Sequence, residues 1–336
     1  MTPALKKRLR WILYPPLLIG IPLWLYSGMI PMPGKSHPGP LPPLTAKQAD
    51  LAASLRRDIV ELAGKIGERN TVRYEALRKA ADYVERELSI AGKVGRQSYL
   101  AGGKSCDNLD VELRGSVKPD EIVIVGGHYD SVVGCAVAND NGTGTAGVLA
   151  LARSLAKTSP ERTLRLVAFV NEEPPHFQGD EMGSRVYARR CRERQENVVA
   201  MLSLETIGYY SDQEGSQQYP APLGLFYPSR GNFIAFVGNV GSRSLVRRCV
   251  RVFRERAAFP SEGGAVPGFL PGVGWSDHES FWESGYPGVM VTDTAPFRYP
   301  HYHLPGDTPD KIDYDRCARV VDGVEQVVRE LAGLPP

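Results

Sequence analysis

The chain has 336 residues, of which 42% are hydrophobic and 23% are charged. This is the composition of a globular protein, and the length allows one large α/β domain or two smaller ones. The formal net charge of +2, part of which comes from the basic first ten residues, argues against a nucleic-acid-binding protein.

The N-terminal part of the chain has the pattern of a membrane anchor. Residues 1–10 carry four basic residues and no acid, and residues 11–30 form an uncharged, mostly apolar run of about the length that crosses a bilayer. This order predicts an uncleaved transmembrane signal anchor with a cytoplasmic N-terminus; a cleaved signal peptide is the alternative. Residues 31–45 are rich in proline and predict a stiff linker. Residues 46–336 would then form the main domain, held at the membrane and outside the cytoplasm.

The cysteine count fits an exported protein without defining a disulfide framework. The odd number leaves at least one thiol unpaired, and no CxxC spacing indicates a zinc ribbon. Export permits disulfides, and we expect Cys135 to pair with Cys191 because both flank the presumed site. The five cysteines are Cys106, Cys135, Cys191, Cys249 and Cys317.

The main domain alternates between apolar runs and helical patterns. Uninterrupted runs rich in valine and isoleucine are typical of strands that are covered on both faces. Helical spacing of apolar residues lies between them, which favours an α/β domain with a largely parallel central sheet. Strands are predicted over 108–113, 121–127, 163–170, 198–204, 232–238 and 286–293. Helices are predicted over 46–66, 73–91, 143–157, 183–195, 241–257 and 315–332.

Acids and histidines follow nearly every predicted strand, which is the end where α/β sheets bind ligands. In chain order they are His128 and Asp130, Asp140, the pair Glu172 and Glu173, Glu205, and the late group His301, His303 and Asp307. Zinc binds histidine nitrogen and carboxylate oxygen, and this set is too large for one four-coordinate ion. It suits two ions that share a carboxylate. Adjacent residues of an extended chain point to opposite sides, so one glutamate of the pair can bind metal while the other serves as a general base for water.

A family resemblance is carried by five motifs, "GGHYDS", "NDNGTG", "NEE", "LETIGY" and "YHLPGDTPDKID". In this order they resemble the secreted zinc aminopeptidases with two co-catalytic metals, metallopeptidase family 28, to which glutaminyl cyclases are related. The resemblance covers about residues 95–330 and includes "SDHESFW". It implies a single three-layer α/β domain whose mixed, mostly parallel sheet of about eight strands lies between helices.

The resemblance also implies a role for each residue, by position. Asp140 would be the carboxylate that bridges two zinc ions, and Glu172 would be the general base. Asp130 would fix the tautomer of the His128 imidazole, and Asp307 either orients His303 or caps a turn. The remaining zinc ligands would be His128, Glu173, Glu205 and His303.

Two departures from the family pattern limit what the resemblance implies about substrates. Glu205 stands where the family most often has aspartate, and "EEPPH" replaces the usual "EExG". The expected function is a zinc-dependent aminopeptidase that acts on the N-terminal residues of peptides. The alternatives are a single-zinc glutaminyl-peptide cyclotransferase, which "NDNGTG" disfavours, and a non-catalytic relative.

Overall fold

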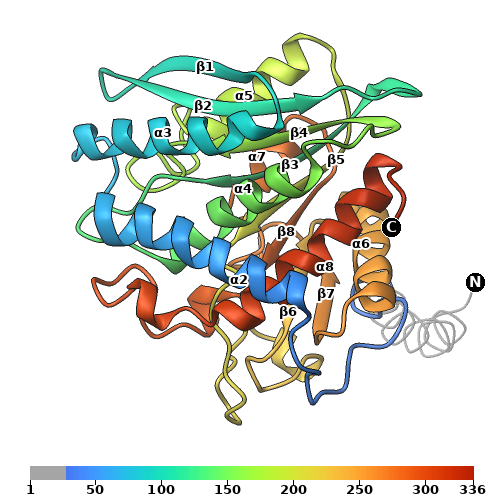
Figure 1. The fold of residues 1–336 in the computed structure, drawn as a ribbon. Helices are drawn as coiled ribbons and strands as arrows, with labels where there is room; N and C mark the ends of the chain where they lie inside the picture. The colour runs from blue at the N-terminus through green and yellow to red at the C-terminus, as the bar shows by residue number, and fades with distance from the viewer. Residues whose placement is uncertain (1–27) are drawn as a thin grey trace, which may run out of the picture.

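We analysed a computed structural model, which describes residues 28–336. The predicted tail 1–10 and almost all of the predicted anchor 11–30 lie outside the described residues. Within residues 28–336, no helix is both long and apolar enough to cross a membrane. The stretch 28–45 runs from the side of α6 to the start of α2 (Figure 1).

The core of the fold is a mixed eight-stranded sheet with the order β1-β2-β4-β3-β5-β8-β6-β7. Its central strands β4, β3, β5 and β8 run parallel to one another, as do β6 and β7, while the pairs β1–β2, β2–β4 and β6–β8 are antiparallel. The sheet predicted from the family resemblance is therefore confirmed. The strands are β1 (Val94–Ala101), β2 (Lys104–Leu113), β3 (Lys118–His128), β4 (Arg162–Phe169), β5 (Asn197–Glu205), β6 (Ile234–Gly238), β7 (Ser261–Ala265) and β8 (Gly288–Thr292).

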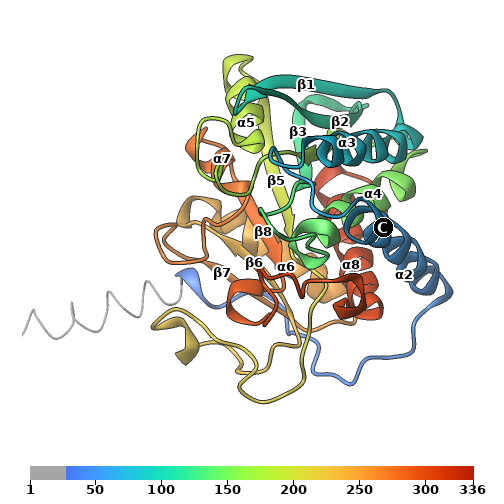
Figure 2. The same ribbon diagram turned by 90° about the vertical axis from the view of Figure 1, so that its left-hand side faces the viewer.

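Helices cover both faces of the sheet and complete the three layers (Figure 2). Helices α2, α3, α4, α6 and α8 lie on one face, and α5 and α7 lie on the other. The helices are α2 (Ala46–Ile59, continued by the π-helix Val60–Ile66), α3 (Tyr74–Leu88), α4 (Gly144–Leu155), α5 (Gly183–Glu193), α6 (Arg243–Arg256), α7 (His278–Glu283) and α8 (Tyr314–Ala332).

Strand β3 explains why the central runs are continuously apolar. Successive side chains of a strand point to opposite faces. Val123 and Val125 therefore join the large core cluster under the first helical layer, whereas Ile122 and Ile124 join the smaller cluster beneath α5 and α7. Both faces are buried, so no position in the middle of β3 remains for a polar side chain.

All six predicted helices and all six predicted strands are confirmed to within a few residues, but β1, β7 and α7 were not predicted. The strand β7 has the sequence "SEGGA", which has little intrinsic strand preference. Its glycines are needed because a Cβ atom on Gly263 would lie 2.7 Å from Val250, and one on Gly264 would lie 2.8 Å from the Tyr227 hydroxyl. Tertiary packing, rather than local preference, makes this segment a strand.

The expected Cys135–Cys191 disulfide is wrong. The five cysteines all lie in the described part of the chain, and all are free and buried. Cys191 packs in the apolar cluster beneath α5, while the Sγ atom of Cys135 contacts the carbonyl oxygen of His303 at 3.5 Å. The two thiols belong to separate parts of the fold, although both follow motifs of the site in sequence.

The proline-rich stretch contacts the domain. The backbone N–H of Ser261 donates to Ser36 Oγ at 2.8 Å, and Arg254 Nη1 donates to the carbonyl oxygens of Pro33 and Gly34 at 3.3 and 3.1 Å. These contacts place residues 33–36 beside β7 and α6.

Candidate metal centre

The strand register brings the predicted residues to one edge of the sheet. Gly126 of β3 pairs with Ser203 of β5, so His128 and Glu205, each two residues further on, end their strands side by side. On the other side of β3, His128 pairs with Phe169, the last residue of β4. The chain then continues from β4 to Glu172 and Glu173. A parallel arrangement delivers all of these side chains to the same end.

The His128 imidazole lies among three carboxylates. Its Nε2 atom is 3.3 Å from Asp140 Oδ1, 3.4 Å from Glu205 Oε2 and 3.7 Å from Glu172 Oε2. His128 is completely buried and the side chains of the three acids are at most 10% exposed. A single ring nitrogen therefore faces three acids that are largely removed from solvent.

His303 approaches the same cluster from the loop after β8. Its Nε2 atom lies 2.9 Å from Asp140 Oδ2 and 3.3 Å from Glu173 Oε2. The two oxygens of Asp140 thus face different histidines. At 32% exposure, the His303 side chain is the most open of the group, which places it at the solvent side of the cluster.

Two overlapping sets of ligand atoms lie close enough to hold metal ions, within 4.8 Å of one another. One set is His128, Glu172 and Glu205, and the other is His128, Asp140 and Glu173. The structure therefore brings together all six residues that the sequence placed at the metals: His128, Asp140, Glu172, Glu173, Glu205 and His303.

Asp130 links the His128 ring to the glutamate pair. Its Oδ1 atom lies 3.4 Å from His128 Nδ1 and accepts a hydrogen bond from the backbone N–H of Glu172 at 3.2 Å. Its Oδ2 atom accepts from the N–H of Glu173, also at 3.2 Å. One buried carboxylate therefore orients both the imidazole and the turn that carries the two glutamates.

The protein's own positive charge does not balance these acids. Burial, with repulsion from neighbouring carboxylates, raises the pKa of Glu173 to about 7 and of Glu205 to about 8, and raises the pKa of Glu172 well above its usual range. Burial also acts on Asp140, but hydrogen bonds from His128 and His303 outweigh it and lower the Asp140 pKa. The cluster carries more carboxylate than the two imidazoles can neutralise.

The donor set fits divalent cations. His128 Nε2 and Glu173 Oε1 are buried without a hydrogen-bond partner among the described residues. Unpaired buried polar atoms are costly, and metal ions would use the lone pairs that face the cluster while adding the missing positive charge. Imidazole and carboxylate ligands are the set that zinc binds.

Asp307 has a role other than the two expected from the sequence, which were to orient His303 or to cap a turn. Its carboxylate accepts hydrogen bonds from the backbone N–H groups of Asn139 and Asp140 at 2.9 and 3.1 Å. It also accepts from the Tyr299 hydroxyl at 2.9 Å. Asp307 therefore fixes the backbone that presents Asp140 to the two histidines.

Glu205 is held by side chains that sequence reasoning did not single out. The Ser276 hydroxyl donates to Glu205 Oε2 at 2.8 Å, and Ser203 Oγ lies 2.8 Å from Ser276 Oγ. Asn141 Nδ2 donates to the same Glu205 oxygen at 3.3 Å. Ser276 belongs to the "SDHESFW" tract and Asn141 to the "NDNGTG" motif, so motif membership was the signal available in the sequence.

Arg69 supports the loop between His128 and Asp140 and was also missed. The side chain is completely buried. It donates from Nε to the carbonyl oxygen of Tyr129 at 2.6 Å and from Nη2 to that of Val137 at 3.3 Å. Burial lowers the pKa of Arg69 to about 10 despite the nearby acids, so the side chain remains a cation at neutral pH.

The other histidines near the motifs make contacts outside the cluster. His278 is buried in α7, where Nε2 lies 2.8 Å from the carbonyl oxygen of Val273. His176 contacts Glu181 at 3.1 Å and Thr71 at 3.3 Å. The ring of His301 packs edge-on against Tyr299.

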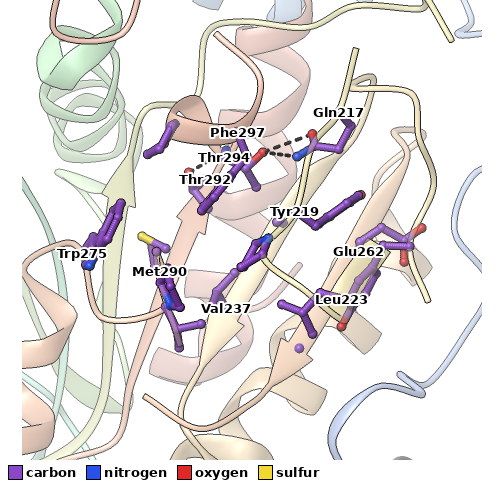
Figure 3. Close-up of a pocket in the computed structure, with 18 of the residues that line it drawn as sticks. Gln217, Tyr219, Leu223, Val237, Glu262, Trp275, Met290, Thr292, Thr294 and Phe297 are labelled. Carbon is purple, nitrogen blue, oxygen red and sulfur yellow. Dashed lines mark hydrogen bonds between the residues drawn. The ribbon is translucent and has the colours of Figure 1, made fainter. Parts of the chain in front are cut away.

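A pocket adjoins the cluster, since Glu205 and Tyr302 are among the residues that line it. Figure 3 shows its walls, including Met290 and Glu262. Its empty volume, with the open mouth included, is about 830 Å³. The pocket extends over β8, β6 and β7 and is lined mainly by apolar and aromatic side chains. The Tyr302 ring also stacks on His303, with ring centroids 4.0 Å apart.

The fold and the site together define an α/β protein with a candidate metal centre at one edge of its sheet. Residues 108–328 match the model of Peptidase family M28, and the chain belongs to this family of zinc metallopeptidases. The uncharacterized protein YfbL of Escherichia coli is 36% identical over 280 residues, which span 80% of this chain and 85% of YfbL. The chain spans about half the length of some other curated relatives that it matches.

Solved structures share the fold at low sequence identity. The zinc aminopeptidase BSAP of Bacillus subtilis has a TM-score of 0.65 and 16% identity, with 83% of this chain and 94% of BSAP covered. The glutaminyl cyclase of Porphyromonas gingivalis has a TM-score of 0.63 and 18% identity, with 84% of this chain and 99% of the cyclase covered. At these identities the similarity concerns the fold alone.

Proposed function

We propose that the protein is an aminopeptidase that holds two zinc ions and removes N-terminal residues from peptides. The observation that carries the proposal is the position of Asp140, whose two oxygens lie 3.3 and 2.9 Å from the ring nitrogens of two different histidines. A carboxylate in this position can bridge two ions. Membership of Peptidase family M28 supports hydrolysis of peptide bonds.

The ligands divide between two ions. His128 and Glu205 would hold one ion, His303 and Glu173 would hold the other, and Asp140 would bridge them. Bound zinc supplies a Lewis acid for the scissile carbonyl and lowers the pKa of water. Asp130 keeps His128 Nδ1 as the proton donor, so that Nε2 presents its lone pair to the centre.

Glu172 is the proposed general base. It is buried, and its Oε2 atom is 3.7 Å from His128 Nε2, so a carboxylate that can accept a proton lies at the edge of the proposed metal centre. Glu172 takes the proton of the attacking water and passes it to the nitrogen of the leaving peptide. Asp130 fixes the Glu172 backbone so that the carboxylate stays at the site of both transfers.

The pocket beside Glu205 is the proposed site for the first side chain of the substrate. It is lined by Glu205 and Tyr302 next to the cluster and extends from them over β8, β6 and β7, so a peptide whose scissile bond lies at the metals would place its N-terminal side chain inside. The apolar walls favour desolvation of that side chain.

Membrane attachment with the catalytic domain outside the cytoplasm is part of the proposal. It rests on the uncharged run 11–30 and the basic residues before it, which follow the positive-inside rule. Protease added outside the cytoplasmic membrane of spheroplasts should digest the domain. A domain that stays protected until the membrane is lysed would contradict this orientation.

A panel of aminoacyl anilides tests the function. The full chain, purified in detergent, is expected to release the chromophore, to lose this activity with a chelator and to regain it with zinc. Metal analysis should give about two zinc ions per chain. About one zinc per chain, together with cyclisation of N-terminal glutamine, would instead identify a glutaminyl cyclase. A zinc-loaded protein that does neither would be a non-catalytic relative.

A further inference from the structure

The pocket beside the metal centre is too deep for a short side chain. Glu205 ends β5, and Glu262 lies on β7 at the other end of the pocket. Strands β8 and β6 separate them, and neighbouring strands are about 4.8 Å apart, so the two backbones are separated by roughly 14 Å. A leucine side chain would leave the β7 end empty, while a long, unbranched side chain would reach it.

Two aromatic pairs line the pocket. Trp275 stacks with Phe297, with centroids 6.4 Å apart and planes at 17°, and Tyr219 stacks with Tyr227 at 5.7 Å and 25°. Figure 3 shows Trp275 and Glu262 on opposite sides, with side chains of β8 and β6 between them. Aromatic rings pack against an alkyl chain and also attract a guanidinium or ammonium group.

Glu262 places a carboxylate at the β7 end of this apolar pocket. Its side chain is 25% exposed, and its ion pair with Arg254 Nη2 is long, at 3.5 Å. The same Arg254 guanidinium also donates to backbone carbonyl oxygens, including that of Ser261 at 2.8 Å and that of Gly34 at 3.1 Å. Burial raises the pKa of Glu262 although Arg254 is nearby, so Arg254 compensates the acid incompletely.

We propose that this pocket selects peptides whose N-terminal residue is arginine or lysine. The alkyl stem of the substrate side chain lies between the aromatic walls, and its cationic end pairs with Glu262. This proposal rests on the aminopeptidase function proposed above. It assigns Glu262 as a residue that determines specificity and that takes no part in the chemical step.

The test compares arginine anilide with citrulline anilide on the full chain. Citrulline has nearly the shape of arginine but no charge, so the comparison isolates the cation. We expect kcat/KM to be higher for arginine by about tenfold, the low end for a hydrogen bond between charged groups. In Glu262→Gln this ratio should fall toward one. Glu214→Gln is the matched control, because Glu214 pairs with Arg230 at 2.7 Å outside the pocket, and it should keep the wild-type ratio.

The possible results distinguish a failure of the proposed preference for basic residues from a failure of the proposed aminopeptidase function. Efficient cleavage of leucine, methionine or citrulline anilides by the wild-type chain, without preference for arginine, would overturn the selection of basic residues and leave the aminopeptidase function standing. A Glu262→Gln variant that keeps the arginine preference would also overturn it. If no anilide is cleaved, both proposals fail. The wild-type ratio decides the matter even where the variant does not fold.

Discussion

The hydroxyl of Ser276 donates a hydrogen bond of 2.8 Å to Oε2 of Glu205, one of the proposed zinc ligands. Glutamate has one more rotatable bond than aspartate, and fixing it at a metal costs more conformational entropy. Ser276, itself in contact with Ser203, restricts this freedom. Ser276 therefore positions this longer side chain through the hydrogen bond.

Ser276→Ala should lower the affinity for the zinc ion assigned to Glu205 by about 10- to 100-fold. This is the usual effect of losing a group that orients a metal ligand. Competition with a chromogenic chelator measures this change, and the second zinc should be retained more tightly. Ser280→Ala is the control, since Ser280 is buried but contacts Ser184. Equal zinc affinity in Ser276→Ala and wild type would contradict a positioning role.

Glu172→Gln should lower kcat by about 10²- to 10⁴-fold, the usual contribution of a general base, while the protein keeps both zinc ions. Anilide turnover and metal analysis of the same preparation measure the two effects. Glu181→Gln, a change in the same loop away from the cluster, should behave as wild type. Because Glu172 also lies within one possible ligand set, loss of a zinc ion from Glu172→Gln would identify it as a ligand instead.

Arg69→Lys should destabilise the fold by about 2 kcal/mol or more, because a lysine cannot reach all four carbonyl oxygens to which the buried guanidinium donates. Urea unfolding measures the difference. Arg73→Lys is the matched control, since its side chain is 66% exposed and should change stability by less than about 0.5 kcal/mol. Equal stabilities of the two variants would show that Arg69 does not hold the loop.

The free energy of unfolding should fall in acid because His278 is buried in the native fold. Burial lowers its pKa to about 4, whereas an unfolded histidine titrates near 6.5, at about its model value. Below about pH 6.5 the unfolded chain therefore binds a proton that the native site does not. The contribution of neutral His278 to the free energy of unfolding is fully present above that pH and is lost as the pH falls toward 4. Between pH 7.5 and pH 5, wild type should lose on the order of 2 kcal/mol more than His278→Gln.

Urea unfolding of both proteins at the two pH values gives this difference, and the contribution of the metal centre cancels between them. His37→Gln, a change in the proline-rich stretch, should keep the pH dependence of wild type. An identical loss in wild type and His278→Gln would mean that the native site accepts the proton.

Much of the fold could be predicted from periodicity, because buried parallel strands and amphipathic helices leave regular apolar patterns in the chain. The polar edge strand β1, the glycine-rich β7 and the six-residue α7 leave no such pattern. Each exists because a neighbour packs against it or pairs with it. The Cys135–Cys191 pairing failed for the related reason that proximity to the same motifs in sequence does not place two side chains in contact.

The sequence by itself determined which residues gather at the candidate metal centre, because most of them follow parallel strands whose carboxyl ends meet at one edge of the sheet. Tertiary structure alone decided how they are held and what lies beside them. Asp307, Ser276 and Arg69 support the centre or its loops from distant segments, through hydrogen bonds that depend on side-chain direction. The pocket that ends at Glu262 forms across three strands, and no local pattern records a cavity, because its shape is set by side chains that are neighbours only in space.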